Sequence, residues 1–250
     1  MRRQHLRAMI GTLVLTVAAL QPAGAVEILA PGSTVAGKSI ADWTAGWWTW
    51  VFQSPSDAVP FSDPDGSLAN LNNGGPVFFV AGTGGGPVER TFSVPAGRPL
   101  LIPMVNYFNT YDTEEVINAA IAAFPGSVTD LFAEIDGVPV ANPFDYLEVT
   151  ADFFSGGLAQ EGSWIASLGV PVGEDVFPSK SSGYWLMIDG LAPGTHTLRF
   201  GGTTLCCGDP FSTEVLAEIN VVPEPAPWSL IALGLIGVVA GRRRGAALTP

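Results

Sequence analysis

Glycine and proline interrupt this chain at intervals of roughly ten residues, a spacing that constrains its fold more than any other feature. The 250 residues include 30 glycines and 21 prolines, and the segments between them are rich in Val, Phe, Leu and Thr. These segments have the length and composition of short β-strands, and the glycines and prolines supply the turns. The pattern predicts a mainly β protein, a β-sandwich of jelly-roll type.

Two segments have the spacing of an amphipathic helix instead. In the first, Ser39 and Asp42 form a capping box, apolar side chains follow at intervals of three and four, and Pro55 ends the helix. A second capping pattern, over 112–115, precedes a similar apolar run that ends at Phe124. We expect both helices to pack on the sheet.

The strands are expected to differ in how they are buried. Three continuously apolar runs have the composition of central strands that are covered on both faces: 77–80, 100–105 and 185–188. A fourth run, 146–153, alternates between apolar and polar residues. Its apolar members, such as Leu147 and Val149, are predicted to face the core. Its polar members, Glu148 and Thr150 among them, are predicted to face solvent.

Residues 1–25 have the three zones of a signal peptide. Arginines come first, a mostly apolar stretch follows over 9–20, and Ala23 and Ala25 are small residues that a signal peptidase accepts. The apolar stretch is shorter than the roughly 20 residues of a spanning helix, which argues against a retained anchor. The paired arginines also resemble a twin-arginine signal, but His5 stands where that signal prefers Phe. We therefore expect export by the general secretory route.

The last residues, 223–250, combine three features of a sorting tail. In order, these are Pro223, Glu224 and Pro225, an apolar run over 228–240, and the cluster of Arg242, Arg243 and Arg244. Proline prevents regular helix or strand, so the junction is expected to be extended and open to a protease. The apolar run can enter a bilayer as a short transmembrane segment, and the arginines place its end on the cytoplasmic side.

This tail closely resembles the PEP-CTERM signal, which a membrane-bound exosortase cleaves. The resemblance implies that exosortase is a partner and that the precursor is held transiently at the inner membrane of a Gram-negative bacterium. It also implies release to the cell surface or extracellular matrix, where exopolysaccharide is the candidate partner. A plain tail anchor is the alternative, but it leaves the Pro-Glu-Pro motif unexplained.

Removal of both ends makes the remaining domain, 26–222, strongly acidic. Six of the 11 basic residues lie in the ends, so five remain against 22 carboxylates, a net charge of −17 instead of the −12 of the whole chain. Nucleic acids and anionic headgroups need positive charge for binding, so we expect neither as a partner. The span of 197 residues has the size of one domain.

A second resemblance covers most of 37–202. It rests on Gly37-Lys38-Ser39-x-x-Asp42-Trp43 with Trp47-Trp48-x-Trp50, on Ile102-Pro103-x-x-Asn106, on Ile135-Asp136-Gly137 and on Gly183-Tyr184-Trp185. These segments look like those of a family of secreted bacterial proteins without an assigned activity. The resemblance implies a shared fold and brings no reaction with it.

The two cysteines, Cys206 and Cys207, are adjacent, which excludes a disulfide between distant parts of one chain. A vicinal disulfide, two free thiols and a bond between molecules all remain open. Without a nearby histidine, the pair makes a poor metal site.

Tryptophan side chains stack on sugar rings, and the first predicted helix holds four of them. Trp43, Trp47 and Trp50 share the apolar stripe that a sheet would cover, so core packing explains them better. Trp48 lies off that stripe and is the candidate for contact with a glycan.

An acidic and amide-rich loop offers a candidate calcium site. Asp63, Asp65 and Asn70 supply the oxygen atoms that hard cations bind. However, the loop lacks the spacing of an EF-hand, and Asp-Pro-Asp-Gly is a turn sequence on its own account. A solvated turn is the preferred interpretation, and no other cofactor is expected.

Hydrolytic chemistry has weaker support. The domain holds one histidine, His196, which we expect to be a partly buried structural residue at a strand start. The sequence contains no Gly-x-Ser-x-Gly nucleophile motif. Glu148 and Asp152 could act together on a glycoside, but simple solvation is the preferred interpretation of both.

These features together predict a non-enzymatic, exported cell-surface or matrix protein that is associated with exopolysaccharide, with glycan binding as a candidate activity. A carboxylate-dependent glycan hydrolase and a calcium-stabilised structural protein are the alternatives.

Overall fold

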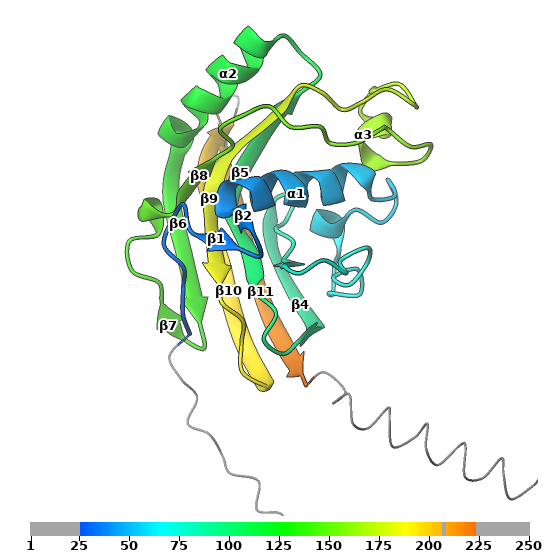
Figure 1. Ribbon diagram of the computed structural model, residues 1–250. Helices are drawn as coiled ribbons and strands as arrows, with labels where there is room; N and C mark the ends of the chain where they lie inside the picture. The colour runs from blue at the N-terminus through cyan, green and yellow to red at the C-terminus, as the bar shows by residue number, and fades with distance from the viewer. Residues whose placement is uncertain (1–25, 207–208, 224–250) are drawn as a thin grey trace, which may run out of the picture.

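The computed structural model describes residues 26–206 and 209–223 (Figure 1). The predictions for the two ends and for the second cysteine lie outside these residues. They concern the signal peptide with Ala23 and Ala25, Cys207, Glu224 and Pro225, the apolar run 228–240, and Arg242, Arg243 and Arg244. Within the described ranges, no helix is long and apolar enough to cross a membrane.

Strands dominate the described structure, which confirms the prediction of a mainly β protein. One sheet has four strands in the order β3 (Phe78–Phe79), β5 (Leu100–Thr110), β9 (Ser179–Ile188) and β8 (Leu147–Val149). The other has five in the order β4 (Gly86–Pro95), β11 (Asp209–Val222), β10 (Gly194–Cys206), β6 (Val128–Ile135) and β7 (Val138–Pro139). A short hairpin of β1 (Thr34–Val35) and β2 (Lys38–Ser39) leads into the first helix.

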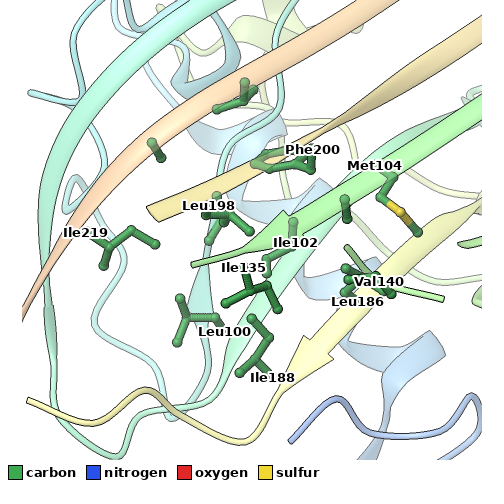
Figure 2. Packing of buried hydrophobic residues seen from close by; sticks show 14 of the residues in the cluster. Leu100, Ile102, Met104, Ile135, Val140, Leu186, Ile188, Leu198, Phe200 and Ile219 are labelled. Atoms are coloured by element: carbon green, nitrogen blue, oxygen red, sulfur yellow. The ribbon is translucent and has the colours of Figure 1, made fainter. Parts of the chain in front are cut away.

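The two sheets enclose one hydrophobic core. Leu100 and Ile102 of β5 belong to it together with Leu198 and Phe200 of β10 (Figure 2). Alternate residues of a strand point to the same face, so these pairs mark the inner face of each sheet. Two neighbouring pairs of strands run parallel, β4 with β11 and β3 with β5. An antiparallel jelly roll has no such pairs, so the strand order differs from the predicted type.

Helix α1 (Ile40–Gln53) covers the outer face of the four-stranded sheet (Figure 1). Leu101 of β5 and Trp185 of β9 pack there against Trp47 of the helix. The strands β5 and β9 are thus buried on both faces, as their continuously apolar sequences predict. The third apolar run, 77–80, was predicted to be central as well, but β3 lies at the edge of its sheet.

The helix boundaries follow from their caps. At the start of α1, Ser39 Oγ accepts a hydrogen bond from the Asp42 N–H at 3.1 Å, and Asp42 Oδ2 accepts one from the Ser39 N–H at 3.2 Å. This confirms the predicted capping box. Helix α2 (Glu114–Ala123) is capped by Thr113, not by the predicted Asp112. A third, one-turn helix, α3 (Trp164–Ser167), was not predicted.

The predicted faces of the strand around β8 are wrong for its middle residues, although Leu147 packs against the core and Asp152 is exposed, as predicted. Glu148 and Thr150 are only 6% and 4% exposed, whereas Val149 is 39% exposed. The side chains do alternate between the two faces, but the polar ones point inward because the protein supplies hydrogen-bonding partners there. Glu148 Oε1 accepts a hydrogen bond from the Gly32 N–H at 2.9 Å, and Thr150 Oγ1 accepts one from the Ser181 N–H at 3.0 Å.

Candidate functional site

A cavity of about 500 Å³ lies between the two sheets, beside α2 and the 3₁₀ turn η2 (Phe124–Ser127). Met104 of β5 and Phe200 of β10 form part of its wall. Figure 2 shows both at the end of the core that is farther from Leu100 and Ile188. None of the described residues that line the cavity carries a charge.

Polar contacts tie the walls of the cavity together. Ser127 Oγ donates to the Phe124 carbonyl at 2.7 Å and lies 2.8 Å from Thr204 Oγ1, which links η2 to β10. Thr213 Oγ1 of β11 donates to the Met104 carbonyl at 3.3 Å and so links the two sheets. These hydroxyls are therefore already engaged with the protein.

The sequence did not reveal this cavity, because its wall comes from segments that are far apart in the chain. Met104, Phe124, Phe200 and Phe211 belong to four different elements. Two exposed apolar residues on β10 and β11 also belong to the wall. Leu205 and Phe211 are 49% and 38% exposed, and both line the cavity.

Trp48 does not form an exposed platform for a sugar. It is 6% exposed, and its ring lies 4.3 Å from that of Phe108 and 4.9 Å from that of Trp47. The expectation of exposure is wrong because α1 is covered on more than its sheet-facing side. The segment from Ala159 to Val176 contributes buried residues to the same cluster and encloses the helix.

The loop proposed for calcium is organised around a buried carboxylate. Asp63 is 2% exposed, and its two oxygens accept hydrogen bonds from the N–H groups of Asp65, Gly66 and Leu68 at 3.2, 3.0 and 2.9 Å. Hydrogen bonds from Ser67 lower the pKa of the Asp65 carboxyl. The described residues contain no group of three or more His, Cys, Asp and Glu that could hold a metal ion. The turn interpretation accounts for the Asp63 contacts, and Asn70 instead donates to the Ser93 carbonyl at 3.3 Å.

Arg90 of β4 holds this loop on the sheet. Its side chain is buried, and it donates to the Asp63 and Ala81 carbonyls at 2.8 Å each, to that of Gly82 at 2.8 Å and to that of Phe61 at 3.3 Å. Burial lowers the pKa of the Arg90 guanidinium, and the charge of Asp63 opposes this shift. These contacts give Arg90 a structural role, which the sequence alone does not distinguish from that of the other four cations of the domain.

His196 is a structural residue, as predicted. It lies near the start of β10, and its Nδ1 is 2.7 Å from Asp136 Oδ2 while its Nε2 is 2.9 Å from the Ala192 carbonyl. Both ring nitrogens are thus engaged within the protein, which leaves neither to act as a base.

The carboxylate pair proposed for glycoside hydrolysis does not line a described cavity. Burial raises the pKa of the Glu148 carboxyl, and the hydrogen bond from Gly32 opposes this shift. Asp152 is exposed. Neither residue lines the cavity between the sheets or the second one, of about 320 Å³, between the N-terminal segment and β7.

The last strand ends where the predicted sorting tail begins. The final sheet contact of β11 pairs Val222 with Pro95, and the Val222 carbonyl accepts a hydrogen bond from the Ala96 N–H at 2.8 Å. The exposed Pro223 follows and has no N–H to extend the ladder. Residues 221–244 match the family model of the PEP-CTERM protein-sorting motif. No curated protein and no solved structure matches the chain.

The PEP-CTERM motif implies exosortase-dependent export of a surface protein, with exosortase as the processing partner. The match covers the end of β11 and the tail, so it identifies how the chain is sorted and leaves the role of the domain open. The resemblance of 37–202 to a family of secreted proteins stays a prediction.

Proposed function

We propose that this protein is an exported, non-enzymatic component of the cell surface or extracellular matrix, and that exosortase removes its tail near Pro223. The PEP-CTERM match at 221–244, whose Pro-Glu-Pro triplet directly follows the last strand, carries this proposal. Cleavage beyond Val222 leaves every described pairing of β11 with β4 and β10 intact. The signal peptide at 1–25 and the apolar run at 228–240 would hold the precursor at the inner membrane before cleavage.

The charges of the domain support a role among neutral polymers. Each of its five basic side chains already has a partner within the protein. Arg90 and Arg98 donate to backbone carbonyls, Arg199 contacts two carboxylates, Lys180 donates to Asn118, and Lys38 lies over the Trp43 ring. With a net charge of −17 around them, these cations are poorly suited to bind nucleic acid or anionic lipid. Exopolysaccharide remains the partner that we propose, through a surface other than Trp48.

The sorting step is tested by changing the motif without removing the tail. Replacing Pro223, Glu224 and Pro225 by alanine is expected to retain the chain in the membrane fraction. Pro227→Ala, which changes a nearby proline outside the Pro-Glu-Pro triplet, serves as the matched control. Immunoblots of membrane and extracellular fractions, with mass spectrometry of the released C-terminus, measure the outcome. Release of the triple variant at the native level would disprove the proposal.

The role after release is tested with exopolysaccharide from the host. Retention of the exported protein on the polymer without shortening supports the non-enzymatic role. Shortening of the polymer chains by the native protein, but not by the Glu148→Gln variant, supports the alternative of a glycan hydrolase. For the third candidate, a calcium-stabilised protein, the melting temperature should fall on addition of a chelator. An unchanged melting temperature would exclude that candidate.

A further inference from the structure

The cavity between the sheets has the chemistry of a binding site for an uncharged ligand. Its described wall is mainly apolar and includes the aromatic rings of Phe124, Phe200 and Phe211. We infer that it binds a neutral, lipid-like small molecule, a hydrocarbon chain or ring without a charged group. This inference concerns a site separate from the sorting tail and does not depend on exosortase.

The size of the cavity does not result from loose packing of the domain. Elsewhere in the same core, Leu100, Ile102 and Leu186 are fully buried at 0% exposure. A mainly apolar pocket of about 500 Å³ beside so well packed a core leaves apolar surface open to water, which is unfavourable. The volume is within the range of roughly 300 to 1,000 Å³ that is usual for sites of small ligands.

The cavity is also held open by contacts across its wall. The Tyr107 and Phe124 rings stack with centroids 5.4 Å apart and planes inclined by 16°. The Ser127–Thr204 contact joins η2 to β10, and the contact of Thr213 with the Met104 carbonyl joins the two sheets. Binding to such a preformed site loses less conformational entropy than binding to a site that must first assemble. The hydroxyls of Ser127, Thr204 and Thr213 already bond to the protein. On the same wall, the buried Asn106 Nδ2 has no partner among the described residues and can donate to a neutral polar group such as an alcohol.

Electrostatics favour a neutral ligand over a charged one. The domain has a net charge of −17, and none of its five cations lines the cavity, so an anion would be repelled without compensation. A cation would find no lining carboxylate among the described residues. Burying either charge without a partner is unfavourable. A long-chain alcohol should therefore bind better than the carboxylate of equal length.

The test uses N-phenyl-1-naphthylamine, an uncharged probe whose fluorescence rises in an apolar site. The exported protein is purified from the cells that make it, and each variant is prepared in the same way. We expect a saturable rise in fluorescence with the native protein. The absence of saturable binding would overturn the inference.

Variants of α2 locate the probe. Ala120 lines the cavity, and Ala120→Trp is expected to weaken binding about tenfold or more by filling it. Ala119 is exposed and is not among the lining residues, so Ala119→Trp is the matched control and should bind as the native protein does. Near-ultraviolet circular dichroism checks folding. If Ala120→Trp is misfolded, the same comparison is made with Ala123→Trp and its control Ala122→Trp. Only Ala123 of that pair lines the cavity, so only Ala123→Trp should weaken binding.

Competition defines the ligand class. 1-Dodecanol should displace the probe, whereas dodecanoate, a carboxylate of the same chain length that is negatively charged at neutral pH, should displace it much less. Equal displacement by both would refute the selection for neutral ligands. Equal binding by the Ala120→Trp and Ala119→Trp variants would refute the location.

Discussion

Replacing the buried Arg90 by methionine should destabilise the protein far more than the same change at Arg199. Arg90 donates four hydrogen bonds to the carbonyls of two loops and is 4% exposed. Arg199 lies on the outer face of the same sheet, where it bonds to Glu134 at 3.3 Å and to Glu214 at 2.8 Å. Methionine keeps most of the aliphatic stem in both cases, so the comparison isolates the guanidinium.

The magnitudes follow from what each change leaves behind. Without the guanidinium of Arg90, several buried carbonyls lose their donor, and each buried polar group left unpaired costs about 1–3 kcal/mol. Partial access of water to the loops reduces the sum, so we expect Arg90→Met to lower the free energy of unfolding by roughly 3–5 kcal/mol. The two carboxylates around Arg199 can turn to solvent. Arg199→Met should therefore cost only about 0–1 kcal/mol.

Urea denaturation monitored by tryptophan fluorescence measures both values, with linear extrapolation to water. Raising the salt concentration should shrink the effect of Arg199→Met, because exposed charges are screened, and should leave that of Arg90→Met nearly unchanged. If the two variants lose equal stability, or if Arg90→Met costs less than about 1 kcal/mol, the loops do not depend on this arginine and the reasoning fails.

Three further changes test other parts of the structure. Burial raises the pKa of Glu148, so the folded state keeps a proton that the unfolded state has lost, and native stability should fall as pH rises through that interval. The urea midpoint of Glu148→Gln, measured between about pH 4 and 7, should not show this decline. If the midpoints of the native protein and the variant change with pH in parallel, the prediction is wrong. Gly66 has a φ of +97°, and a Cβ there would lie 2.4 Å from the Thr91 carbonyl oxygen. Gly66→Ala should therefore lower the thermal midpoint more than Gly37→Ala, where φ is +81° and no atom lies within 4 Å of the added carbon. Trp48→Ala should cost about 3–5 kcal/mol in urea denaturation, since the ring is buried, and a loss of polymer binding without a loss of stability would restore its proposed surface role.

Local sequence patterns predicted the elements whose environment is set by near neighbours. The capping box at Ser39 and Asp42 depends on two residues three positions apart, and the structure reproduces it. The continuous apolar runs of β5 and β9 predicted burial on both faces because a strand under a helix and over a second sheet needs apolar residues at every position. Helix α3 was missed because a single turn is too short to show a helical period.

Errors arose where distant segments decide which side of an element is covered. Trp48 is off the stripe that faces the sheet, yet Phe108 and the segment from Ala159 to Val176 bury it from other sides. Glu148 was assigned to solvent because a carboxylate usually lies there, but the Gly32 N–H, 116 residues away, gives it an inward partner. The cavity was missed for the same reason, because no contiguous stretch contains its wall.

The position of the predicted sorting tail would allow its removal without disruption of the described domain. Strand β11 is central in its sheet and pairs with β10 on one side and β4 on the other, so it contributes more to the sheet than an edge strand could. A proline immediately after Val222 ends this pairing, because it has no N–H to donate to a neighbouring strand. The Pro-Glu-Pro triplet therefore starts at the first residue whose removal breaks no described pairing of β11. The cavity lies near the opposite end of β11, where Phe211 and Thr213 line it, so the proposed cleavage near Pro223 and the proposed ligand site concern opposite ends of one strand.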